Sequence, residues 1–155
     1  MDASRFAHRG NALRHGRVSE PNRAYLLTSV TYNRQALFQD WRLARMVVAE
    51  MRCLHEQQAA RSLAWVIMPD HLHWLVQLES MPLPRLMLQL KSRSAIAINK
   101  ARNDSGRVWQ KGFHDHALRQ EEDLAATARY IVANPLRAGL VKRIGDYPHW
   151  DAIWL

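Results

Sequence analysis

Two histidines separated by one residue, His71 and His73, have the residue type and spacing of a metal site. In a β-strand, residues i and i+2 project from the same side, so the two imidazoles would lie together while Leu72 points away. Two imidazole nitrogens held side by side can bind one divalent metal ion. The alternative is an ordinary pair of surface histidines, because this pattern also arises by chance.

A second pair with the same spacing, His114 and His116, encloses Asp115 instead of an apolar residue. A charged residue at the middle position is less suited to a strand that is buried on one face. The second pair could still line the same cavity. We therefore keep His114 as a candidate accessory residue.

Tyr130 and Asn134 form the second group that could do chemistry. A helical residue advances by about 100°, so these two lie about 40° apart on one polar stripe, which Asp123 and Thr127 share. The adjoining stripe is apolar and consists of Leu124, Ala128 and Ile131. Such a helix can pack on the body of the protein while it turns Tyr130 toward a cavity, where the Asn134 amide oxygen could be a third metal ligand. The alternatives are a half-buried packing tyrosine and an asparagine that ends the helix before Pro135.

The elements that must position these groups follow from the hydrophobic periodicity. Strands are expected at residues 24–31, 62–68, 71–78 and 108–118, and helices at residues 38–60, 83–101 and 121–134. The order predicts an α+β fold, a ferredoxin-like βαββαβ sandwich with a C-terminal helix that carries Tyr130. Two helices would cover one face of a four-stranded antiparallel sheet and leave the other face for that helix or a ligand.

Three local signals fix details of this arrangement. Pro69-Asp70 predicts a tight turn, which makes the strands on either side an antiparallel hairpin. Asp40 is a plausible cap for the first helix. The alternate residues Leu72, Trp74, Val76 and Leu78 are apolar and suit the helix-covered face of the sheet. The tail at residues 145–155 is expected to pack back on the body.

Length and charge bound the class of protein. The 155 residues fit one domain. The net charge of +8 with a pI of about 10.4 indicates a polyanionic partner, and nucleic acid is favoured over an acidic membrane surface. Most of the basic residues are arginines, which bind phosphate oxygens bidentately. Residues 1–23 form a basic segment, so we expect a DNA-contacting arm followed by one domain at residues 24–155.

The single cysteine, Cys53, excludes an internal disulfide and a cysteine-based zinc site, and it fits a reducing cytoplasm. The N-terminus lacks the apolar stretch of a signal peptide. No run approaches the ~18 apolar residues that span a bilayer. We therefore expect a cytoplasmic protein without a membrane partner.

The motif VIMPDHLHWLVQL followed by YIVANPLRAGLV resembles the single-tyrosine transposases of the HUH superfamily. The phrases VWQKGFHDHALRQEEDL and ARYIVANPLRAGLV are most similar to one branch, the REP-associated tyrosine transposases. The resemblance covers roughly residues 14–150. It implies that His71 and His73 are metal ligands, that Tyr130 is the nucleophile and that Asn134 is the third ligand.

The resemblance also implies an activity. The enzyme would use Mg²⁺ or Mn²⁺ to cut and rejoin single-stranded DNA at REP-type hairpins through a 5′-phosphotyrosine intermediate. The general base is not identified, and His114 is one candidate. We expect a monomer, with a dimer as the alternative, and the resemblance implies that the protein is bacterial and nucleoid-associated.

Basic side chains are the candidates to contact phosphates of the hairpin. They are Arg14, Arg17, Lys91, Arg93, Lys100, Arg102, Lys111 and Arg119. Trp109 or Phe113 could stack on a base. The competing functions are a non-catalytic or domesticated protein that binds hairpin DNA or RNA, and a phosphoesterase in which Tyr130 is only structural.

Overall fold

The computed structural model of the chain describes residues 19–119 and 121–153. Its centre is a five-stranded antiparallel sheet in the order β4-β1-β3-β2-β5. The strands are β1 (Ala24–Val30), β2 (Ala60–Met68), β3 (His71–Leu78), β4 (His114–Leu118) and β5 (Trp150–Ala152). The four expected strands are all present, but the count of four is wrong, because the tail adds β5 to the edge beside β2.

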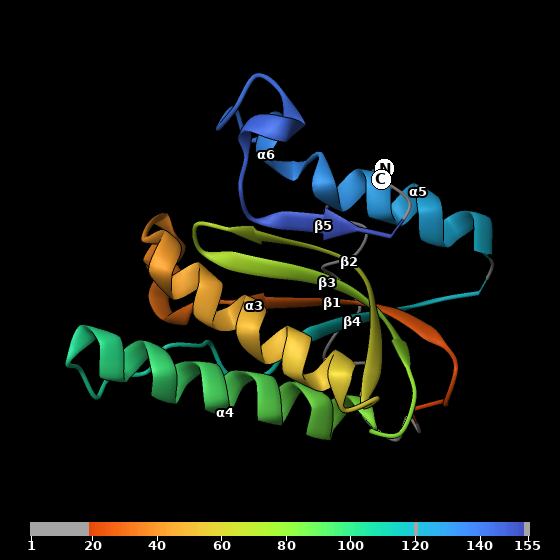
Figure 1. Cartoon of the computed structure of the whole chain (residues 1–155), viewed down its shortest axis with the longest axis horizontal. Helices are drawn as coiled ribbons and strands as arrows, with labels where there is room; N and C mark the ends of the chain where they lie inside the picture. Colours follow the sequence, from red (N-terminus) through yellow and green to blue (C-terminus); the bar gives the residue numbers. More distant parts are fainter. Residues whose placement is uncertain (1–18, 120, 154–155) are drawn as a thin grey trace.

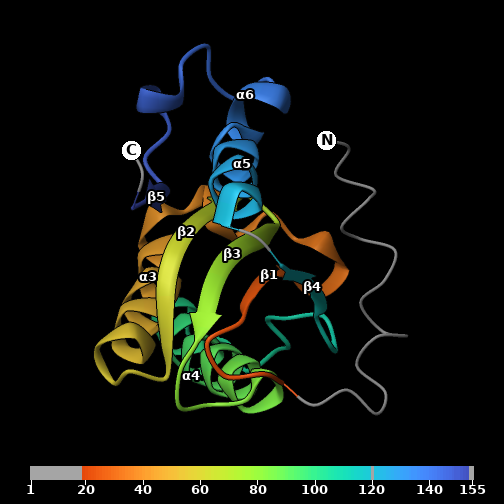
Figure 2. The same cartoon turned by 90° about the vertical axis from the view of Figure 1, so that its right-hand side faces the viewer.

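Helices cover both faces of the sheet (Figures 1 and 2). Helices α3 (Trp41–Glu56) and α4 (Leu83–Arg102) lie on one face, as the sequence predicts. Helix α5 (Glu121–Val132) and the short helix α6 (Asn134–Arg137) lie on the other. The result is three layers, with the strands between two layers of helix.

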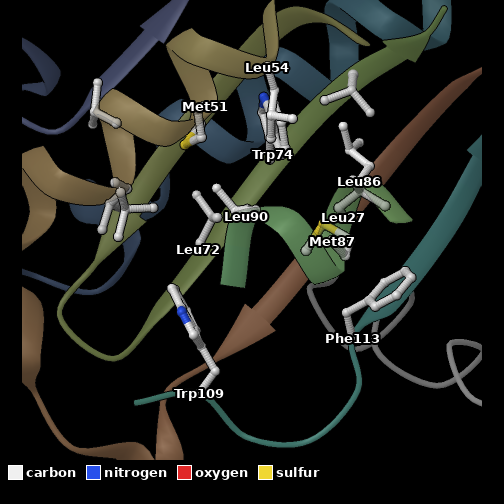
Figure 3. Close-up of a cluster of buried hydrophobic side chains, with 14 of the residues drawn as sticks. Leu27, Met51, Leu54, Leu72, Trp74, Leu86, Met87, Leu90, Trp109 and Phe113 are labelled. Carbon is white, nitrogen blue, oxygen red and sulfur yellow. The ribbon is translucent and has the colours of Figure 1, made fainter. Parts of the chain in front are cut away.

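The face toward α3 and α4 holds the larger core, part of which Figure 3 shows. Leu72 and Trp74 of β3 are 1% and 0% exposed, and Leu27 of the neighbouring β1 is 1% exposed. Trp74 keeps its one polar group satisfied, because Nε1 donates to Ser62 Oγ at 2.9 Å. The alternating apolar positions of residues 71–78 are therefore buried as the sequence predicts.

A second cluster lies under α5 on the opposite face. Leu26 and Leu75 face each other across β1 and β3, and Ala128 and Ile131 of α5 are in the same cluster. The apolar stripe expected on this helix thus packs on the sheet. This arrangement fixes α5 over the side of β3 on which His71 and His73 lie.

The end of α5 differs from the prediction. The helix ends at Val132, and Asn134 opens α6 instead of closing α5. Pro135 explains both facts. Its ring clashes with the carbonyl one turn back, and it has no N–H for an interior helical bond, yet it fits the first turn of a new helix.

Two other elements are shorter than expected. Helix α3 begins at Trp41, after two single turns of 3-10 helix, and the Asp40 cap is confirmed because its carboxylate accepts from the Arg42 backbone N–H. Only His114–Leu118 of residues 108–118 forms a strand. Trp109 makes one isolated bridge to Thr31, and the chain turns at Gly112, whose φ of +79° favours glycine.

The tail packs on the edge of the sheet. Tyr147 Oη donates to the Ile67 carbonyl at 2.5 Å, and burial raises the pKa of Tyr147 to about 12. The Ile67 N–H in turn donates to the His149 carbonyl. These contacts extend the pairing of β5 with β2 beyond its three residues. None of the helices in the described part of the chain is long and apolar enough to cross a membrane.

Candidate metal and tyrosine site

Strand register places several polar residues in one row on the α5 face. His73 lies opposite Thr28 of β1, and Thr28 lies opposite His114 of β4. Directly opposed residues of an antiparallel pair point to the same side of a sheet. His71 projects to this side as well, two residues before His73. The sheet therefore brings together both predicted ligands and the accessory candidate His114.

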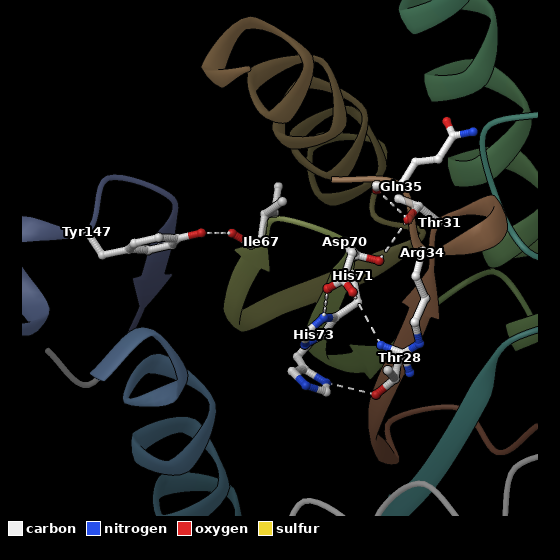
Figure 4. Close-up of polar contacts among 9 residues, drawn as sticks. All are labelled: Thr28, Thr31, Arg34, Gln35, Ile67, Asp70, His71, His73 and Tyr147. Carbon is white, nitrogen blue, oxygen red and sulfur yellow. Dashed lines mark hydrogen bonds and ion pairs between the residues drawn. The ribbon is translucent and has the colours of Figure 1, made fainter. Parts of the chain in front are cut away.

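His71 is held by a carboxylate (Figure 4). Its Nδ1 lies 2.7 Å from Asp70 Oδ1, and Arg34 lies 3.3 Å from the other oxygen of Asp70. Burial would raise the pKa of Asp70, but the hydrogen bond and charge of His71, together with Arg34, outweigh it and lower that pKa. The Asp70 carboxylate accepts the Nδ1 proton of His71. The imidazole then presents Nε2, with its lone pair, to a ligand.

His73 is held by a hydroxyl in the same way. Its Nδ1 lies 2.8 Å from Thr28 Oγ1. Burial, reinforced by the charges of His71 and Arg137, lowers the pKa of His73 to about 3. The ring is therefore neutral at physiological pH, which is the form that binds metals.

The two rings are close and differently oriented. The centroids of His71 and His73 are 4.9 Å apart, and the ring planes meet at 79°. Each Nδ1 has its own partner, so each Nε2 is left for a ligand, and holding of this kind by outer residues is typical of metal-binding histidines. Within residues 19–119 and 121–153, no cluster of three or more His, Cys, Asp or Glu side chains could hold a metal. A metal here would need a different third donor, and the amide of Asn134 is of a suitable type.

Tyr130 and Asn134 lie at the junction of α5 and α6, and α5 packs against β2 and β3. Both side chains are half-buried. One residue that the sequence analysis did not select, Arg137, contacts both. Its Nη2 donates to the Tyr130 carbonyl at 2.7 Å and to Asn134 Oδ1, and its guanidinium lies 3.8 Å from the Tyr130 ring centroid.

A divalent metal held by the three predicted ligands would be offered two imidazole nitrogens and one amide oxygen. The amide oxygen of Asn134 already accepts from Arg137, but a carbonyl oxygen has a second lone pair that can bind an ion. The amide oxygen is a donor that suits Mg²⁺ and Mn²⁺, whereas imidazole nitrogens also accept ions such as Zn²⁺. The residues present fit the ion that the sequence resemblance implies.

Four functional candidates were missed at the sequence level: Thr28, Arg34, Asp70 and Arg137. Asp70 was interpreted only as a turn residue, although a carboxylate next to a candidate ligand is itself a signal. Arg137 lies inside the quoted phrase YIVANPLRAGLV, three residues after Asn134. Thr28 and Arg34 gave no signal, since only strand pairing and the turn at residues 32–34 bring them to the histidines.

The predicted DNA contacts on α4 lie away from this site. Arg93, Lys100 and Arg102 are exposed on α4, on the face of the sheet opposite to α5. Arg102 pairs loosely with Asp104 at 3.9 Å. Lys91 donates to the carbonyls of Gln110 and Gly112 and so fixes the loop before β4. Arg14 and Arg17 lie outside the described residues.

The aromatic candidates for base stacking are buried. Trp109 and Phe113 are 6% and 9% exposed and belong to the core under α3 and α4. Trp109 Nε1 donates to the buried Ser94 Oγ at 2.9 Å. A buried ring offers no face to a base, so the prediction of stacking on either residue is wrong.

Lys111 and Arg119 are exposed near the two ends of β4. Arg119 lines a hollow of about 830 Å³ together with Arg23 and Arg61. The same hollow includes Gln77, which lies six residues along β3 from His71 and four from His73, or about 20 Å and about 13 Å along the strand. It is a basic surface that is separate from the candidate metal site.

Comparison with known proteins identifies the family. The sequence profile described as Transposase IS200 like matches residues 21–134, a range that includes both histidines, Tyr130 and Asn134. A Haemophilus influenzae protein assigned as a REP-associated tyrosine transposase is 31% identical over 106 residues, which are 61% of this chain and 60% of that protein. The REP-associated tyrosine transposase of Escherichia coli is 29% identical over 87 residues, which are 55% of this chain and 50% of that protein. The matches thus span between half and three fifths of these relatives.

Solved structures share the fold. A REP-associated tyrosine transposase bound to a REP hairpin aligns with a TM-score of 0.71 and 23% identity, over 86% of this chain and 79% of that one. A Deinococcus radiodurans protein described as a transposase aligns with a TM-score of 0.53 and 23% identity, over 70% of this chain and 87% of that one. Together with a family profile that covers more than half of the residues, these similarities lead to one conclusion: the chain belongs to the family of IS200-like transposases.

Proposed function

We propose that this protein is a metal-dependent tyrosine transposase that cuts and rejoins single-stranded DNA at REP-type hairpins. The observation that carries the proposal is the pair His71 and His73, each with Nδ1 held and Nε2 left for a ligand. They lie on the same face as the helix junction with Tyr130 and Asn134. Family membership makes transposition the reaction class to which this geometry belongs.

Tyr130 is the proposed nucleophile. Its Oη attacks the phosphorus of a DNA phosphodiester, the bond from phosphorus to O3′ breaks, and the products are a 5′-phosphotyrosine and a free 3′-OH. The phenol loses its proton, and the departing O3′ gains one. The new phosphotyrosine keeps the energy of the broken bond, so a 3′-OH from another strand can reverse the step without ATP.

His71, His73 and Asn134 are the proposed ligands of Mg²⁺ or Mn²⁺. When bound, the ion would supply Lewis-acid polarisation of the phosphate that is cut. The Asp70 carboxylate holds His71 in the orientation and tautomer that present Nε2, and the Thr28 hydroxyl holds the orientation of the His73 ring. The low pKa of His73 means that protons do not compete for its nitrogen at neutral pH.

Hairpin DNA is the proposed partner, because a REP hairpin is bound in a structural neighbour of this chain. Cutting needs an unpaired, accessible backbone, so the cut would fall in a single-stranded flank. The exposed Arg34 and Arg137 near the histidines, and the arginine-lined hollow with Arg119, are candidates to contact phosphates. The net charge of +8 favours binding and predicts that affinity falls steeply with salt.

An adduct assay tests the proposal. The full chain is incubated with Mn²⁺ and a 3′-labelled hairpin that carries single-stranded flanks, because the fragment on the 3′ side of the cut stays joined to the tyrosine. The covalent protein–DNA adduct is counted after denaturation. Tyr130→Phe removes only the hydroxyl and is expected to abolish the adduct. Tyr147→Phe is the matched control, because this tyrosine is half-buried on the same side of the sheet and donates to a backbone carbonyl.

Two outcomes would contradict the proposal. If adduct still forms in Tyr130→Phe, the nucleophile is a residue other than Tyr130. Tight hairpin binding without any adduct from the wild-type chain would identify a binding protein that lacks strand-cutting activity. Loss of adduct in Tyr147→Phe with unchanged melting temperature would show that the assay does not discriminate between tyrosines.

A further inference from the structure

Arg137 is anchored at the tyrosine by only part of its side chain. An arginine carries five N–H donors. The two on Nη2 are used by the Tyr130 carbonyl and by Asn134 Oδ1. No other hydrogen bond joins the side chain to the described part of the protein, so the three donors on Nη1 and Nε are left to an external partner.

A purely structural role accounts for one contact alone. The last carbonyls of an α-helix lack helical partners, and Nη2 caps one of them at the Tyr130 carbonyl. Capping does not require the guanidinium to stack on the Tyr130 ring at 3.8 Å, nor to hold the amide oxygen of Asn134. It also does not require an exposed residue whose charge reaches His73.

From these contacts we propose that Arg137 is a catalytic residue whose free N–H donors bind the non-bridging oxygens of the phosphate that Tyr130 attacks. The inference rests on the proposed function. The two N–H groups of Nη1 and the one of Nε can each donate a charge-assisted hydrogen bond to a phosphate oxygen, and the anchored Nη2 keeps the plane of the guanidinium oriented. Negative charge builds up on these oxygens as Tyr130 Oη approaches phosphorus. A fixed cation beside the nucleophile stabilises that charge without reorganising during the step.

Kinetics of the full chain with Mn²⁺ and the labelled hairpin test the role. Removal of one preorganised donor to a developing charge typically slows a reaction by about 100-fold or more. Arg137→Gln should therefore lower the single-turnover adduct rate at saturating DNA by about 100-fold, while the Kd for hairpin changes less than about threefold. Arg137→Lys keeps the positive charge but loses the planar guanidinium, so its adduct rate should fall between those of the wild type and Arg137→Gln.

Arg129→Gln is the matched control. Arg129 is an exposed arginine of α5, next to Tyr130 in sequence, and its loss changes the net charge equally. Its adduct rate at saturating DNA should equal that of the wild type. If the adduct rate of this variant fell as far as that of Arg137→Gln, the change in net charge alone would explain the loss. That result would overturn the proposed role of Arg137.

A neutral phosphate separates chemistry from structure. A methylphosphonate at the cut position replaces one charged oxygen by a methyl group, so less charge needs stabilisation. The defect of Arg137→Gln should shrink from about 100-fold to less than about tenfold on this substrate. A merely structural arginine would give the same defect on both substrates, and that result would overturn the proposal.

The outcomes distinguish this inference from the proposed function. A wild-type chain that forms no adduct would overturn both. A wild-type chain that forms adduct, together with Arg137→Gln that forms it equally fast at saturating DNA, would overturn the role of Arg137 alone. Arg137→Lys and the methylphosphonate comparison keep the test decisive if Arg137→Gln lowers the melting temperature.

Discussion

Toward α3 and α4, strand β3 presents Leu72 and Trp74, which are 1% and 0% exposed; toward α5 and α6 it presents His71 and His73, which are half-buried. The first face is apolar along its whole length. The second is apolar only at Leu75, which packs under α5, and it is polar on both sides of that residue, at the two histidines and at Gln77. Alternate residues of this one strand therefore have different roles: one set packs in the core, and the other includes the two histidines of the polar site.

The division between the two faces shows how a small domain can carry a polar site without losing its core. Each of the two imidazoles on the α5 face has a hydrogen-bond partner, Asp70 for His71 and Thr28 for His73. The apolar face buries Trp74 and its neighbours and supplies most of the stability. If the separation is real, substitutions at odd and even positions of β3 should affect different measurements.

The largest expected effect is on stability. Trp74→Ala should lower the free energy of unfolding by about 3–5 kcal/mol, because the cavity under α3 and α4 cannot collapse fully. That is a large part of the roughly 5–15 kcal/mol of a typical domain. Trp41→Ala is the control, since Trp41 is 63% exposed and should cost less than about 0.5 kcal/mol. Urea unfolding measures both.

The separation of faces fails if Trp74→Ala and Trp41→Ala have similar midpoints in urea. Such a result would mean that the core on the α3 side contributes little. The stability of the domain would then have to come mainly from the smaller cluster under α5.

The second effect is on metal binding. Replacing His71 and His73 together with Ala removes two of three proposed ligands and should weaken Mn²⁺ binding more than about 100-fold, because each nitrogen contributes directly. Isothermal titration or Mn²⁺ electron spin resonance measures the affinity. Hairpin binding and the unfolding midpoint should stay closer to wild type than in Trp74→Ala. Unchanged Mn²⁺ affinity in the double variant would remove the metal site.

Much of this arrangement was predictable from residue patterns. The alternation in HLHWLVQL predicts the strand at residues 71–78 and assigns each residue to a face, because a strand has a strict period of two. The helical stripe predicts that Ala128 and Ile131 pack inward. Both patterns are local and repeat several times, so they can be recognised in the sequence without knowledge of the tertiary structure.

The remainder depends on contacts between distant segments. Thr28 reaches His73 across 45 residues, and Arg34 reaches Asp70 across 36. The three-residue strand β5 has too few residues for a period, and only the edge of β2 makes it a strand. The burial of Trp109 was missed for the same reason. An aromatic in a basic segment looks like a base-stacking residue until the fold places it in the core.

The third effect concerns these outer contacts. Thr28→Val keeps the shape of the side chain but removes the hydrogen bond to His73 Nδ1 and should weaken Mn²⁺ binding by about 10–100-fold. Ser29→Ala is the control, because Ser29 lies on the opposite face beside Leu72 and should leave the affinity unchanged. Equal losses in the two variants would mean that β1 acts only as a scaffold.

Asp70→Asn extends the same test to His71. The carboxylate has a pKa below its ordinary value, so its favourable contribution is present above pH 3.8 and is lost as the pH falls through the lowered value. At neutral pH the substitution should therefore act fully, again weakening Mn²⁺ binding by about 10–100-fold. An effect that appears only in acid would contradict this ionisation state.

The smallest effect concerns the boundary between apolar and polar parts of the α5 face. Thr127 is 0% exposed, and its Oγ1 has no hydrogen-bond partner among the described residues. Thr127→Val removes an unpaired buried hydroxyl at constant shape and should raise the free energy of unfolding by up to about 1 kcal/mol. Thr127→Ser keeps the hydroxyl but leaves a cavity, and it should lower that free energy by about 1 kcal/mol. If Thr127→Val is instead the less stable variant, the hydroxyl has a partner, and the polar part of this face extends further under α5 than the histidines and Thr28 indicate.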